Sequence, residues 1–106
     1  MKLTEYKIDA WDNQAILETL RFESYLILLL KIDETKLPIK EGIKNLLAVD
    51  LNYNIKWIAN LPKGEEIYAY YDEIKMKDDK LQALCNSHLA IIDPLSGDIV
   101  SEQFIK

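Results

Sequence analysis

Short apolar segments separated by turn residues run through the second half of the chain, and this punctuation constrains the fold more than any other feature. Asn45 to Asp50 is apolar up to a closing Asp, Leu51 to Asn54 has turn chemistry, and Ile55 to Ala59 resumes the apolar pattern. Two apolar runs joined in this way predict a β-hairpin. We expect Trp57, in the second strand, to be buried, because it shares one face of that strand with other apolar residues.

Four more strands are predicted beyond this hairpin. Ile67 to Met76 alternates apolar and charged residues with period two, and Asp72 breaks the alternation, which indicates a bulge or an edge position. The remaining strands are separated by polar turns and cover Leu81 to Cys85, Leu89 to Ile92 and Ile99 to Phe104. This succession of short strands and turns favours an antiparallel meander.

The first half of the chain leaves more than one prediction open. Thr4 to Ile8 alternates as a strand would. Ala15 to Leu20 fits a short amphipathic helix and, equally, a strand that ends at Arg21. Tyr25 to Ile32 is apolar almost without interruption, which is typical of a central strand covered on both faces.

Length and composition fit one globular domain. The 106 residues are too few for two ordinary domains, and 49% of them are hydrophobic, which is enough for one core. The prediction is a single domain, 1–106, with an all-β fold. It is an antiparallel meander or sandwich of about seven or eight strands, with one short N-terminal helix as the open alternative.

Two stretches of the second half resemble each other. Leu46 to Ile55 and Leu89 to Ile99 each consist of an apolar strand closed by Asp, a polar turn, and a second strand that opens on Ile. In both, the Asp side chain can bond backbone amides across the turn, and Gly97 or an Asn near Asn54 would supply a positive φ. Repeated units of this kind are typical of propeller blades and related meanders.

The sequence offers few groups for catalysis or metal binding. Cys85 and His88 are the only cysteine and the only histidine, and on a continuous strand their side chains would point to opposite faces. They could meet only across a tight turn at Asn86 and Ser87. No segment holds two glycines close together, as a phosphate loop requires. We therefore expect no enzyme activity, no catalytic residue, no metal and no cofactor.

Cysteine content and the N-terminal residues indicate a compartment. A single cysteine forms no intrachain disulfide, which suits a reducing environment. Met1 to Trp11 has no apolar core of the kind that a signal peptide needs, and the apolar run Tyr25 to Leu30 is far shorter than the ~20 residues that span a bilayer. We expect a cytoplasmic protein without membrane contact.

The formal net charge of −5 disfavours nucleic acid as a partner and favours a basic protein. The predicted partner-binding residues are Glu65, Glu66, Tyr71 and Glu73. Tyr71 would face solvent, because it lies at the opposite parity to Tyr68 and Tyr70, which are assigned to the core face. An exposed tyrosine brings a large contact area at low entropic cost, so it would anchor a partner that the acids attract.

Part of the chain resembles a known group of proteins. Asp50 to Trp57, Asp79 to Ala83 and Ile92 to Val100 are similar to repeat units of small bacterial β-propeller-repeat-like proteins, with an Asp-turn-Asn-x-x-Trp unit and a later Asp-Pro-x-x-Gly turn. The group includes immunity proteins of polymorphic toxin and contact-dependent growth inhibition systems. The resemblance covers roughly Asn45 to Val100, and Tyr53 stands where a glycine is usual in the first turn.

The resemblance implies a function. It suggests a cytoplasmic immunity protein that binds and occludes a cognate toxin, a cationic nuclease that the acidic groups would steer into the complex. It carries over no quinone or metal site. The alternative is an orphan structural or protein-interaction module with no toxin partner, and a toxin reading frame immediately upstream would favour the first function over the second.

Overall fold

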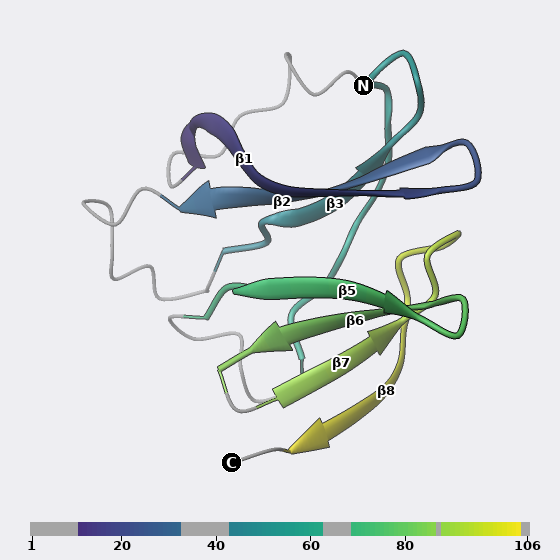
Figure 1. The fold of residues 1–106 in the computed structure, drawn as a ribbon. Helices are drawn as coiled ribbons and strands as arrows, with labels where there is room; N and C mark the ends of the chain where they lie inside the picture. Colours follow the sequence, from purple (N-terminus) through teal and green to yellow (C-terminus); the bar gives the residue numbers. More distant parts are fainter. Residues whose placement is uncertain (1–10, 33–42, 63–68, 87, 105–106) are drawn as a thin grey trace.

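The computed structural model describes residues 11–32, 43–62, 69–86 and 88–104, and every regular element in these ranges is a β-strand (Figure 1). The strands are β1 (Trp11–Phe22), β2 (Tyr25–Ile32), β3 (Leu46–Val49), β4 (Ile55–Ile58), β5 (Glu73–Lys77), β6 (Lys80–Cys85), β7 (His88–Ile92) and β8 (Ile99–Phe104). The predicted all-β fold is confirmed, with eight strands in the described ranges. The strand predicted at Thr4 to Ile8 lies outside them.

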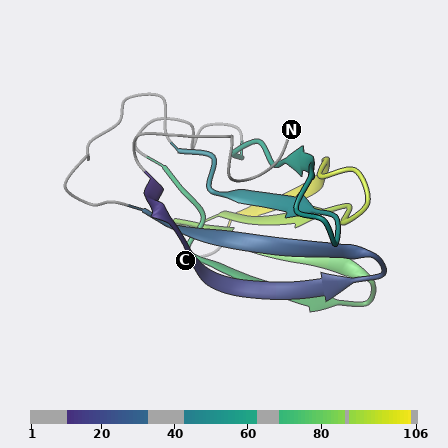
Figure 2. The same cartoon turned by 90° about the horizontal axis from the view of Figure 1, so that it is seen from above.

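The strands form two antiparallel sheets, and each sheet follows the order of the chain. Sheet I is β1-β2-β3-β4 and sheet II is β5-β6-β7-β8. Figures 1 and 2 show the two sheets as stacked layers, with the strands of sheet I lying over those of sheet II. Antiparallel neighbours can be joined by tight hairpin turns, and short polar turns connect β1 to β2, β3 to β4 and the successive strands of sheet II, whereas residues 33–45 separate β2 from β3.

The segment Ala15 to Leu20 lies within β1, so the strand alternative is correct and the helix is not formed. β1 pairs with β2 from Trp11 opposite Ile32 to Phe22 opposite Tyr25, with register shifts on either side of Ile16. Such bulges insert residues that have no partner and interrupt the period-two alternation. The interrupted alternation is what allowed a helical interpretation of this segment.

The prediction of a central strand covered on both faces is confirmed for β2. Ile27 and Leu29 belong to the cluster that lies between the two sheets, whereas Leu28 and Leu30 belong to a second cluster on the opposite face of sheet I. All four side chains are at most 1% exposed. Burial on both faces explains why residues 27–30 are apolar at every position rather than at alternate ones.

The main hydrophobic core fills the space between the sheets. Sheet I contributes side chains such as Ile27, Leu29 and Trp57, and sheet II contributes Leu81 and Ile92 together with smaller ones such as Ala83. Trp57 is 7% exposed, which confirms its predicted burial. Burying apolar surface on this scale is the main favourable contribution to folding in a chain of this length.

The sequence repeat occupies equivalent places in the two sheets. The predicted hairpin of Asn45 to Ala59 is formed by β3 and β4, which are the third and fourth strands of sheet I. β7 and β8 are the third and fourth strands of sheet II. Asp50 and Asp93 each follow the third strand of a sheet, so the two halves of the described chain are built on one plan.

Candidate protein-binding surface

The turns that follow the first and third strands of each sheet lie at one end of the molecule, on the right in Figure 1. We call this surface the turn end and define it as residues 22–25, 50–54, 77–80 and 93–98. An open hollow of about 500 Å³ joins turns of both sheets, since it is lined by Arg21–Glu23, Asp79–Lys80 and Asp93–Leu95. The turn end therefore combines segments that are distant in the sequence.

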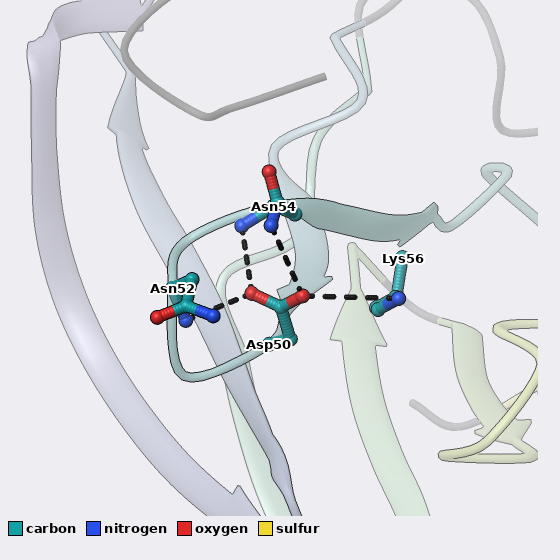
Figure 3. A network of polar contacts seen from close by, with 4 residues as sticks. All are labelled: Asp50, Asn52, Asn54 and Lys56. Carbon is teal, nitrogen blue, oxygen red and sulfur yellow. Dashed lines mark hydrogen bonds and ion pairs between the residues drawn. The ribbon is translucent and has the colours of Figure 1, made fainter.

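The turn between β3 and β4 is organised around the carboxylate of Asp50 (Figure 3). The backbone amides of Asn52 and Asn54 donate to its Oδ1 at 2.8 and 2.9 Å, and the side-chain amide of Asn54 donates to Oδ2 at 3.2 Å. Lys56 Nζ lies 3.8 Å from the same oxygen. One carboxylate thus accepts hydrogen bonds from turn N–H groups that would otherwise be bonded only by water.

The charge of Asp50 is favoured by this environment. The hydrogen bond from the Asn54 amide, together with the Asn52 and Lys56 contacts, holds the pKa of the Asp50 carboxyl below its ordinary value of 3.8, against a smaller opposing effect of burial. A carboxyl whose pKa is lower in the folded state stabilises the fold above its unfolded pKa, and that contribution is lost as the pH falls through the folded value.

We therefore expect the Asp50→Asn variant to be less stable than the wild type at pH 7 and to approach it as the pH falls below 3.8. Asn keeps the shape of the side chain and an acceptor oxygen but has no charge to lose. The measurement is urea unfolding of both proteins from pH 7 to pH 3. A stability difference that stays constant over the whole range would show that the Asp50 charge does not support the fold.

The turn between β7 and β8 uses the same chemistry and packs on the first repeat. Asp93 Oδ1 accepts the backbone N–H of Leu95 at 2.9 Å. In the other turn, Asp50 Oδ1 accepts the backbone N–H of Asn52 in the same way. Trp57, from β4, donates its indole N–H to the carbonyl of Pro94 at 2.9 Å. A Cβ at Gly97, whose φ is +78°, would lie 2.5 Å from a ring carbon of Trp57. The tryptophan of one repeat is therefore covered by the turn of the other.

Tyr53 is the most unusual residue of the turn end. Its φ is +62°, in the left-handed region that favours glycine, so the positive φ of this turn comes from Tyr53 and not from an Asn near Asn54 as predicted. For a residue with a side chain this backbone costs about 1–2 kcal/mol. The ring is nonetheless 47% exposed, and Leu51 in the same turn is 53% exposed. Exposed apolar and aromatic side chains held on a fixed turn are suited to protein contact.

Charged side chains surround these residues. The exposed acids of the turn end are Glu23, Asp78, Asp79 and Asp98, and the exposed bases beside or within it are Arg21, Lys56, Lys77 and Lys80. Both central residues of the β5–β6 turn, Asp78 and Asp79, have positive φ values, as a two-residue hairpin turn of type I′ requires. The turn therefore presents both carboxylates at its tip.

The partner-binding patch predicted from the sequence is not assembled in the described part of the chain. Glu65 and Glu66 lie outside the described residues. Glu73 is exposed at the start of β5, and its part in binding stays a prediction. The prediction that Tyr71 faces solvent is wrong, since that side chain is 1% exposed.

The error at Tyr71 has a local cause. The alternation does break at Asp72, as predicted, but Asp72 and Glu73 are both exposed, and the regular strand begins only at Glu73. A strict period of two, continued backwards from buried Ile74, requires Asp72 to be buried and Tyr71 to be exposed. Because Asp72 and Glu73 are exposed in succession, the residues before them lie on the opposite faces to those predicted. Tyr71 consequently lies in the core between the sheets, whereas Tyr70 packs against the outer cluster of sheet I.

Tyr71 serves as a link inside the molecule. Its hydroxyl donates to the carbonyl of Asn60 at 2.6 Å. Burial, with added repulsion from Cys85 and Glu102, raises the pKa of the Tyr71 hydroxyl, so the group stays protonated and remains a donor. It cannot act as an exposed anchor, and Tyr53 is the aromatic side chain that the turn end presents instead. In the sequence, the presence of Tyr53 at a position where glycine is usual indicated that this residue is special.

The structure does place Cys85 and His88 opposite each other, across the turn that begins at Asn86. Cys85 is fully buried, and the His88 ring makes an edge contact with Phe104, with 5.4 Å between the ring centres. A nucleophile needs access to its substrate, which a thiol with no exposed surface does not have. The pair therefore belongs to the packing between β6, β7 and β8.

The described residues hold no group of three or more His, Cys, Asp or Glu side chains that could bind a metal ion. Within the same ranges, no helix has the length and apolar character needed to cross a membrane. Comparison with protein-family models, with curated proteins and with solved structures gave no match to this chain.

Proposed function

We propose that this chain is an immunity protein that occludes a cognate toxin of basic charge, and that the turn end is the surface it uses. The observation that carries the proposal is Tyr53, which is 47% exposed on a backbone conformation that glycine would adopt without strain. Strained residues that the surrounding structure holds in place concentrate at functional sites. An aromatic ring on such a turn is suited to bury itself in a partner.

Charge supports the same proposal. The net charge of −5 favours encounter with a basic protein, and Asp78 and Asp79 extend that charge to the tip of one turn. In such a complex the acids act mainly on the rate of association, while the aromatic and apolar contacts of Tyr53 and Leu51 set the rate of dissociation. Occlusion needs no chemistry, only a surface that covers the toxin.

Replacing Tyr53 with glycine separates stability from binding. Because glycine adopts a φ of +62° without a steric penalty, the Tyr53→Gly variant is expected to unfold at higher urea, with about 1 kcal/mol more stability. The same change removes the proposed anchor and should speed dissociation from the partner. Urea unfolding followed by circular dichroism checks the first effect. Because glycine also gains freedom in the unfolded chain, the reference is Tyr53→Ala, which keeps the Cβ, and a Tyr53→Gly variant no more stable than Tyr53→Ala would show that the turn is not strained.

The binding test starts from the source cell. Immobilised wild-type chain is used to capture proteins, which mass spectrometry then identifies. We expect one basic protein that the wild type and a Leu17→Ser control retain and that Tyr53→Gly releases faster in surface plasmon resonance. Leu17 is a matched control because it is 55% exposed on β1, away from the turns. Equal dissociation from all three chains would place the interface elsewhere, and recovery of no basic protein would favour the orphan interaction module.

A further inference from the structure

We draw no further inference here: the strongest candidate, the partly buried apolar face of sheet II that carries Leu84, Leu89 and Ile91, carries none because nothing in the structure shows what covers it.

Discussion

Replacing Asn45 with leucine is expected to lower the free energy of unfolding by about 3–5 kcal/mol. Asn45 is fully buried and connects β2 to the segment that leads into β5. Its side-chain amide donates to the carbonyls of Leu30 and Tyr71 at 3.0 and 2.9 Å, and its Oδ1 accepts the amide of Tyr71 at 2.8 Å. Leucine keeps the volume but leaves these three backbone groups buried without that partner, and each such loss costs about 1–3 kcal/mol.

Chemical denaturation of Asn45→Leu, followed by far-ultraviolet circular dichroism, measures the loss. Asn60→Leu is the matched control, because the Asn60 side chain is exposed and the group that accepts the Tyr71 hydroxyl is its backbone carbonyl. The control should stay within about 0.5 kcal/mol of the wild type. If Asn45→Leu were as stable as the control, water or a shifted backbone would have to bond the Leu30 carbonyl and the carbonyl and amide of Tyr71 in its place.

Patterns that depend on neighbouring residues alone were readable from the sequence. The β3–β4 hairpin follows from an apolar run, a turn and a second apolar run, because each strand buries its side chains locally on one face or both. The continuous apolar run of β2 indicated burial on both faces for the same reason. Asp50 and Asp93 were identified as turn organisers because an Asp side chain bonds amides only two to four residues away.

Features that depend on irregular backbone could not be predicted from the sequence pattern. A bulge beside Ile16 interrupts the alternation of β1, so strand and helix fitted that segment equally. Tyr71 was assigned to the surface because period two was assumed to continue through Asp72 and Glu73, where it does not. Asn45 was taken only as the first residue of a strand, since nothing in the sequence shows that Tyr71 lies beside it.

The candidate site was only partly predictable for a related reason. The sequence identified each turn separately and noted Tyr53 in place of glycine. Which turns share one end of the molecule depends on the pairing of whole sheets, and the hollow beside Arg21, Asp79 and Asp93 arises only when sheet I stacks on sheet II. A patch defined along one strand, such as the predicted one around Glu73, could not anticipate a surface made of several turns.

The two repeats meet at Trp57, and the loss of its side chain should have an effect as large as that of Asn45→Leu. Trp57→Ala is expected to cost about 3–5 kcal/mol, because it opens a cavity in the core between the sheets. It also removes the indole donor that the carbonyl of Pro94 uses at 2.9 Å, and it leaves Gly97 without the ring on which it packs. The loss would therefore loosen the β7–β8 turn as well as the core.

Two further variants separate these contributions in urea unfolding experiments. Trp57→Phe keeps most of the buried ring but has no N–H. It should lower the free energy of unfolding by about 1–3 kcal/mol, which is less than the loss for Trp57→Ala and more than the loss for a surface substitution. Leu51→Ala, at a side chain that is 53% exposed in the neighbouring turn, is the control and should stay within about 0.5 kcal/mol of the wild type. If Trp57→Phe were as stable as the wild type while Trp57→Ala lost the full amount, the junction would rest on ring packing alone. If Trp57→Ala matched the Leu51→Ala control, the two repeats would not depend on each other through Trp57 at all.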